Sequence, residues 1–158
     1  MKVSLFITLL LLSPFALSAS VFQPDGCEYG VEFLQKPTYQ TVTTEYGEHL
    51  VALISNDEFF LKAECMPLID RGSDVDKMRA IMLYAKQNGI QYPTFQQASE
   101  SLGRIVSVRG TKLVANKHIT IRSIWYYGQT SALSIQVGAL SPIYPTLEIL
   151  KFISSVSK

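Results

Sequence analysis

Apolar and polar residues alternate with a period of two through much of the last third of the chain, which is typical of strands with one buried face. The alternation covers residues 103–114, 119–127 and 132–137. The middle segment carries apolar side chains on both faces near its end, so we predict that it is a central strand. Gly110 either turns the chain or bulges one longer strand, and Asn116-Lys117 marks the next turn.

A helical period follows these strands. Pro145 suits the first turn of a helix, since its missing amide hydrogen would have no partner there. We expect a helix beginning at Tyr144-Pro145-Thr146 and laid on the sheet. The apolar residues with helical spacing are Leu147, Ile149, Leu150, Phe152, Ile153 and Val156.

The front half also shows a period of two, over residues 27–33, 39–46 and 59–65, and an apolar run typical of a well-buried strand over residues 49–54. Together these segments predict four strands. Gly47 lets the chain reverse between the second strand and the third. A helix is the competing interpretation around this glycine, and we prefer the hairpin. The residues that also fit helical spacing are Tyr46, Leu50, Leu53 and Ile54.

Two helices are predicted between the two groups of strands. Ser73 caps the first helix and Gly89 ends it, while Thr94 opens a second, short helix that ends at Leu102-Gly103. The buried stripe expected on the first helix is Val75, Met78, Ile81, Met82 and Ala85. The element order ββββ-α-α-βββ-α predicts an α+β fold, in which an antiparallel sheet packs with helices in a sandwich.

The N-terminal segment has the anatomy of a secretory signal peptide. Lys2 precedes an apolar run over residues 3–12, and small residues follow around Ala16 to Ser20. The run is shorter than the roughly 20 residues that a transmembrane helix needs, and no second candidate follows. We therefore predict a signal peptide over residues 1–19 and a single soluble domain over residues 20–158, in the periplasm or secreted.

Charge is balanced overall but divided between the two halves. Beyond residue 19 the chain has 13 basic and 13 acidic side chains, since Lys2 is the only charge removed from 14 and 13. Residues 20–100 hold 12 acidic and 6 basic side chains, and residues 101–158 hold 1 acidic and 7 basic ones. A basic surface for an acidic partner would explain this division, but we favour strands that compensate each other within one sheet. Nucleic acid is not an expected partner.

Cys27 and Cys65 are the two cysteines of the chain, and we predict that they form a disulfide in an oxidising compartment. If four strands alternate in direction, the start of the first and the end of the fourth lie at the same edge of the sheet. Two separate buried thiols are the alternative.

No local motif carries recognisable catalytic chemistry, so we predict no catalytic residue, no metal and no cofactor. Glu45, Glu48 and His49 have the side-chain types of metal ligands and would share a face on a helix. In the hairpin they become a solvated turn. His118 is expected to be an exposed turn residue.

Arg122 and Tyr126 are our candidate for a partner-binding patch. Successive strand residues face opposite sides, so at least one aromatic of Trp125-Tyr126-Tyr127 can reach a surface, and we assign Trp125 to the core. The patch requires Tyr126 to be exposed beside Arg122. Cover by the last helix is the alternative.

The order of elements resembles the PsbP-like αβα sandwich, to which small bacterial envelope proteins of the DcrB type are similar. In residues, the resemblance rests on the strand from Cys27 to Phe33 and on the helix end Phe152-Ile153-Ser154-Ser155-Val156. It implies an adaptor, assembly or accessory role without shared catalytic residues. We therefore predict an accessory protein that binds another envelope component without catalysis. A small envelope hydrolase, or an inhibitor of a secreted enzyme, is the rival interpretation.

Overall fold

The computed structural model describes residues 19–44, 47–68 and 74–158, and its main element is one antiparallel sheet of seven strands. The strands are β3 (Thr38–Thr44), β4 (Gly47–Ser55), β5 (Phe59–Pro67), β6 (Gln91–Glu100), β7 (Gly103–Val114), β8 (Lys117–Tyr127) and β9 (Ser131–Leu140). Their spatial order is β3-β4-β5-β9-β8-β7-β6. Between β5 and β6 the chain passes over the positions of β9, β8 and β7 to the far edge of the sheet. The last strand, β9, then pairs with β5 and joins two meanders.

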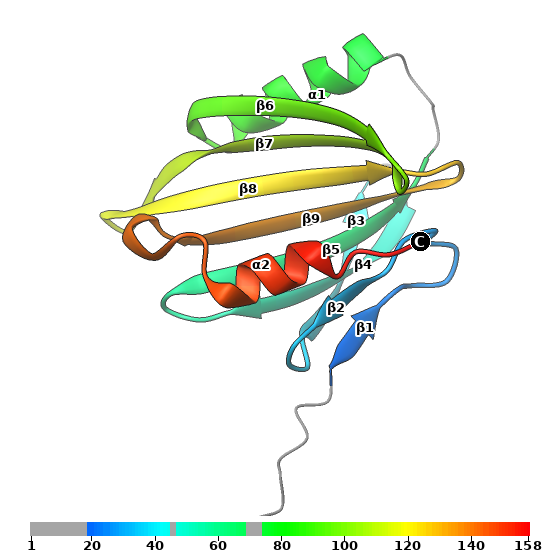
Figure 1. The fold of residues 1–158 in the computed structure, drawn as a ribbon, viewed down its shortest axis with the longest axis horizontal. Coiled ribbons are helices and arrows are strands. Elements are labelled where there is room, and N and C mark those ends of the chain that lie inside the picture. The colour runs from blue at the N-terminus through cyan, green and yellow to red at the C-terminus, as the bar shows by residue number, and fades with distance from the viewer. Residues whose placement is uncertain (1–18, 45–46, 69–73) are drawn as a thin grey trace, which may run out of the picture.

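The remaining elements cover the two faces of this sheet (Figure 1). Helix α1 (Asp74–Gln87) lies on one face. The other face carries helix α2 (Leu147–Ser154) and a two-stranded ribbon of β1 (Ser20–Phe22) and β2 (Val31–Phe33). A short 3₁₀ helix, η1 (Ser141–Ile143), links β9 to α2. Within the described ranges, no helix is long and apolar enough to cross a membrane.

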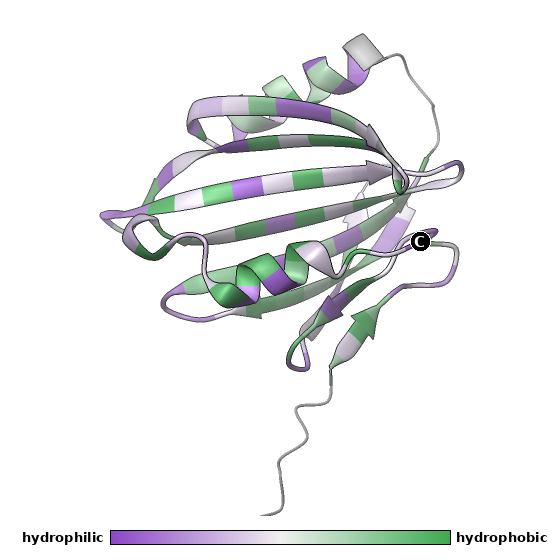
Figure 2. Cartoon of the chain, viewed as in Figure 1, coloured by the Kyte–Doolittle hydropathy of each residue, from purple (hydrophilic) through white to green (hydrophobic). Residues whose placement is uncertain are grey.

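Each face of the sheet has its own hydrophobic core. On the α2 side, the rings of Phe33 and Phe152 lie 4.7 Å apart, over β5 and β9. On the α1 side, Ile81 and Ala85 pack against β7 and β8, and Tyr84 meets the edge of Trp125 at 5.1 Å. Figure 2 shows the apolar and polar residues alternating along the strands, as expected where one face of a strand is more deeply buried than the other.

The predicted hairpin at Gly47 is confirmed, because β3 and β4 pair there and Gly47 has a φ of 109°. The central position of β8 is also confirmed, between β7 and β9. Gly110 lies inside one long strand, which settles the alternative that the sequence left open. A side chain at Gly110 would collide with Ile90 and the carbonyl oxygen of Gln91.

The predicted short helix over residues 94–102 is wrong, because this segment is the edge strand β6. It pairs antiparallel with β7, with a register irregularity between Gln91 and Thr94. This edge strand is exposed over most of its length, so its sequence lacks the alternation of apolar residues that predicts a strand. The remaining local signal was Thr94, which suggested a helix N-cap. Hydrogen bonding to β7 outweighs that weak local preference.

The predicted first strand is also shorter than expected. Only Val31–Phe33 is a strand, and it pairs with β1 outside the main sheet. Residues 23–30 form a loop, in which Cys27 and Tyr29 are buried against the α2-side core. The disulfide between Cys27 and Cys65 is present, but the parity argument for it was wrong, since the first strand is not in the same sheet.

Both helices bury a narrower stripe than expected. On α1, Ile81 and Ala85 are buried whereas Met82 is 54% exposed. On α2, Ile149 and Phe152 are buried, and Leu147 and Leu150 are 61% and 51% exposed. Thr146 is the N-cap of α2 and its hydroxyl accepts a hydrogen bond from the Ile149 amide, so Pro145 precedes the helix. The expected cap of α1, Ser73, and the signal segment lie outside the described residues.

Candidate binding groove

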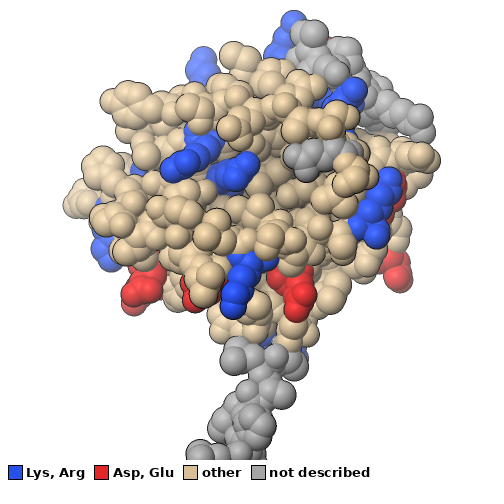
Figure 3. Space-filling view, in the orientation of Figure 1, with Lys and Arg blue, Asp and Glu red and all other residues tan. Residues whose placement is uncertain are grey.

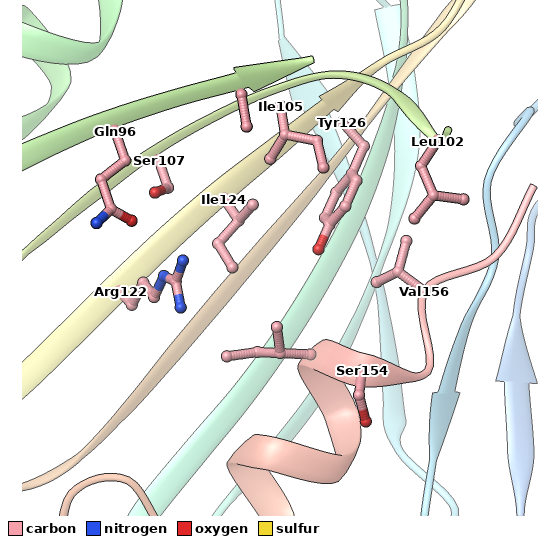
Figure 4. Close-up of a pocket in the computed structure, with 11 residues that line it drawn as sticks. Gln96, Leu102, Ile105, Ser107, Arg122, Ile124, Tyr126, Ser154 and Val156 are labelled. Carbon is pink, nitrogen blue, oxygen red and sulfur yellow. The ribbon is translucent and has the colours of Figure 1, made fainter. Parts of the chain in front are cut away.

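A groove lies on the α2 face of the sheet, over β6, β7 and β8 and beside the C-terminal end of α2 (Figure 4). It has a volume of about 340 Å³, within the range typical of small-molecule sites. The lining side chains come from the three strands, the β6–β7 turn and the end of α2. They are Gln96, Ala98, Leu102, Ile105, Ser107, Arg122, Ile124, Tyr126, Ile153, Ser154 and Val156.

Strand register brings these side chains together. Alternate residues of β8 face the groove, so Arg122, Ile124 and Tyr126 follow one another along its floor. Ser107 of β7 lies opposite Ile124, and Ile105 lies opposite Tyr126. Because β6 pairs with β7 in turn, Gln96 and Ala98 complete the same face at the edge of the sheet.

The groove is divided along its length into a polar end and an apolar end. Figure 4 shows Arg122, Gln96 and Ser107 at one end, and Leu102 and Val156 at the other. Ile124 lies between the two groups. The arrangement can therefore hold a ligand that is itself polar at one end and apolar along the rest.

The structure places the predicted pair, Arg122 and Tyr126, on one face, but not as an exposed patch. Tyr126 is only 4% exposed, and its ring lies 6.0 Å from the ring of Tyr29. Arg122 is partly exposed. Tyr126 is thus part of the groove floor beside the end of α2. This arrangement is nearer to our alternative, in which the last helix covers Tyr126, than to the exposed patch.

Arg109 is a further residue of this face that the sequence analysis did not single out. It is the direct cross-strand partner of Arg122, and its guanidinium carbon lies 5.1 Å from the centre of the Tyr144 ring. Burial raises the pKa of the Tyr144 hydroxyl, while the positive charges of Arg109 and Arg122 act in the opposite direction. The phenol therefore remains a neutral hydrogen-bond donor at neutral pH.

The two guanidinium groups are not neutralised within the described part of the chain, where neither forms an ion pair with a carboxylate. Their like charges lie on directly opposed residues, an arrangement that destabilises an antiparallel pair. Figure 3 shows basic side chains next to each other in the middle of this face, away from the acidic ones. The strands of the two halves do share one sheet, as we favoured, yet this part of the basic half is left uncompensated.

His49 does not belong to a metal site with its sequence neighbours. The residue is 9% exposed and its Nε2 atom lies 2.6 Å from Glu64, which also accepts a hydrogen bond from Lys62. Glu48 is exposed on the adjacent position of the strand, and Glu45 lies outside the described residues. No group of three metal-ligating side chains occurs among the residues that the structure describes. His49 is thus a buried partner of Glu64 and not the solvated turn residue that we expected, whereas His118 is exposed, as predicted.

A second polar cluster lies under α1, on the other face of the sheet. The hydroxyl of Tyr84 lies 3.2 Å from that of Ser123, and the Gln136 amide donates to both. Each of these three side chains has a hydrogen-bond partner within the cluster, so the cluster holds α1 on the sheet. We therefore do not consider it a ligand site.

The N-terminal loop supports the apolar end of the groove. The Tyr29 hydroxyl donates to the carbonyl oxygens of Leu102, at 2.5 Å, and Tyr127, at 3.1 Å. Gly103 follows with a φ of 103°, and a Cβ there would lie 2.9 Å from the same hydroxyl. The Cys27–Cys65 disulfide ties this loop to β5. The loop thereby fixes the β6–β7 turn that carries Leu102.

No protein-family model and no curated protein matches the chain. A similar solved structure is that of LpqN, described as involved in cell envelope biogenesis of Mycobacterium tuberculosis. The two chains are 13% identical, with a TM-score of 0.45, over 89% of this chain and 90% of that one.

Proposed function

We propose that the protein is an exported, non-catalytic accessory protein of the cell envelope that binds another envelope component in the groove over β6–β8. The observation that carries the proposal is the position of Arg122, which has no carboxylate partner among the described residues, at the polar end of a groove that is mainly apolar toward its other end. Apolar lining with a few polar groups that fix orientation is the usual composition of a ligand site.

The location outside the cytoplasm is supported by two features. The N-terminal segment has the pattern of a signal peptide. The protein has a Cys27–Cys65 disulfide, and disulfides persist in oxidising compartments and are rare in the cytosol.

Site-specific photocrosslinking in intact cells of the native host tests the proposal. A photoreactive amino acid replaces Gln96, which is exposed and lines the groove. The matched control replaces Gln97, which is also exposed but, as the next residue of the strand, faces the other side of the sheet. We expect an envelope component to be captured from position 96 and not from position 97, and less of it in an Arg122→Gln background.

Equal capture at both positions, or none at position 96, would overturn the proposal. Purified protein is assayed in parallel against cell-wall substrates. Turnover of such a substrate, without capture, would favour the hydrolase interpretation, and capture of a secreted enzyme would favour the inhibitor.

A further inference from the structure

We propose that the ligand of the groove is an anionic amphiphile, whose acidic group is bound by Arg109 and Arg122 and whose single hydrocarbon chain lies over Ile124 toward Leu102. This inference rests on the proposed function and assigns the chemistry of its ligand. Phosphate and carboxylate are the two acidic groups considered.

The argument for an anion begins with the opposed arginines. Arg109 and Arg122 repel each other across β7 and β8, and the described chain supplies no carboxylate to either of them. A phosphate or carboxylate between the two would replace repulsion by charge-assisted hydrogen bonds, which are the strong ones in proteins. Guanidinium groups match both acids in geometry.

Neighbouring groups suit the same acid. The Tyr144 ring lies against the Arg109 guanidinium and helps to hold it on this face. Ser107 and Gln96 line the polar end of the groove and add further donors. The bound acid would thus meet donors from β6, β7 and β8.

The rest of the groove is built for hydrocarbon. From Ile124 onward its walls are mainly the side chains of Ile105, Leu102 and Val156, with the ring of Tyr126, and Ser154 adds a hydroxyl at the end of α2. Arg122 and Tyr126 are four residues apart in one strand, so the groove runs for about 13 Å at 3.3 Å per residue. A zigzag of carbon–carbon bonds of about 1.5 Å each covers that length with roughly ten bonds.

The lining favours a hydrocarbon chain over a peptide. A bound peptide needs regularly spaced partners for its amide and carbonyl groups. Beyond Ser107 and Gln96 at the polar end, the other wall residues toward Leu102 are mostly aliphatic. A hydrocarbon chain needs no such partners and gains from each methylene that it buries.

Titration calorimetry with decyl phosphate, below its micelle-forming concentration, tests the proposal on the full mature chain. We expect saturable binding of one molecule per chain, at least tenfold weaker in Arg122→Gln and in Arg109→Gln. The matched control, Arg79→Gln, removes a positive charge from an exposed position of α1 on the other face and should leave the affinity unchanged. Inorganic phosphate and neutral decyl maltoside should each bind at least tenfold more weakly than decyl phosphate.

The chain-binding end has its own test. Ala98→Phe places a ring in the groove from the edge strand, and position 98 itself belongs to neither buried core. It should abolish the gain from lengthening the alkyl chain, which in the native protein is roughly twofold to fourfold per methylene up to about ten carbons. Circular dichroism checks that each variant folds.

Three outcomes would overturn the inference. These are equal affinity for decyl maltoside, an equal loss in Arg79→Gln, and tighter binding of an acidic peptide than of any alkyl phosphate or carboxylate. Comparison of decyl phosphate with decanoate decides between the two acids. Capture of a protein from position 96 alongside no binding of amphiphiles would reject this inference and leave the proposed function standing.

Discussion

The carboxylate of Glu28 accepts hydrogen bonds from both the hydroxyl, at 2.9 Å, and the backbone amide of Thr130, which lies 102 residues further along the chain. The amide of Ser131 is a third donor to the same oxygen. This contact fastens the N-terminal loop to the β8–β9 turn. A side chain at Gly128 would collide with the carboxylate, so the turn is shaped around it.

The hydrogen bonds of Glu28 predict a pH-dependent stability. They lower the pKa of this carboxyl from 4.5 to about 2, with the backbone bond from Thr130 as the largest cause. Because the unfolded chain then binds more protons than the folded one between these two values, stability rises with pH across that window. Glu28→Gln should therefore have a smaller rise in the free energy of unfolding from pH 2 to 4.5, measured by urea unfolding.

The difference between wild type and Glu28→Gln isolates this carboxyl from the other acids. At pH 7 the variant should be the less stable protein, and the gap should close toward pH 2. Glu58→Gln, at an exposed position, is the control and should follow the wild type. A constant gap across the window would contradict the assignment.

The disulfide predicts a large loss of stability on reduction. Cys27 and Cys65 are 38 residues apart, and closing such a loop stabilises the folded state by about 4 kcal/mol on the chain-entropy model. The double variant Cys27→Ser/Cys65→Ser should lose about this much, measured by urea unfolding. Dithiothreitol should destabilise the wild type and leave the variant unchanged. Two alkylatable thiols in the unreduced mature protein would refute the bridge.

The two faces of α2 predict opposite results for two substitutions. Phe152 is buried against Phe33, so Phe152→Ala should cost about 3–5 kcal/mol through lost burial and a cavity. Leu150, from the same helix, is 51% exposed, and Leu150→Ala should change stability by less than about 0.5 kcal/mol. Equal losses at both positions would mean that the helix packs in another orientation.

The polar cluster under α1 predicts an effect from the loss of one hydroxyl. Tyr84→Phe removes an acceptor of the Gln136 amide and a partner of Ser123, which is fully buried. Ser123 and Gln136 keep each other as partners, so the loss of two hydrogen bonds should cost about 1–3 kcal/mol in the free energy of unfolding. Tyr92→Phe, at a position 86% exposed, is the matched control and should be neutral. A neutral Tyr84→Phe would mean that water replaces the lost hydroxyl.

Part of the groove could have been predicted from the sequence. The hairpin of β7 and β8 turns at Ala115 and Asn116, both with positive φ, as a two-residue turn requires. Placing the turn there pairs residue 114 with 117 and, by counting back, Arg109 with Arg122. We placed the turn one residue later, at Asn116-Lys117, and so did not see that the two arginines oppose each other.

Other features depend on tertiary structure that local patterns do not encode. The burial of Tyr126 results from the position of α2 and from the ring of Tyr29, which comes from a loop almost 100 residues earlier. The edge strand β6 has few apolar residues, and its partner β7 determines its conformation. By contrast, β8 and β9 were predictable because both of their neighbours in the sheet enforce a strict period of two.

The pairing of β5 with β9 has a consequence for the timing of folding. Residues 59–67 meet residues 131–139 at the centre of the sheet, so the two meanders join only when the last strand is available. Pairings between residues so far apart in the sequence slow folding, because closing the long loop costs conformational entropy before the stabilising contacts form. For a chain that emerges N-terminus first, the edge of β5 that pairs with β9 stays unpaired until nearly the whole sequence has emerged. An open edge of this kind pairs readily with other chains, so aggregation is the main risk during that interval.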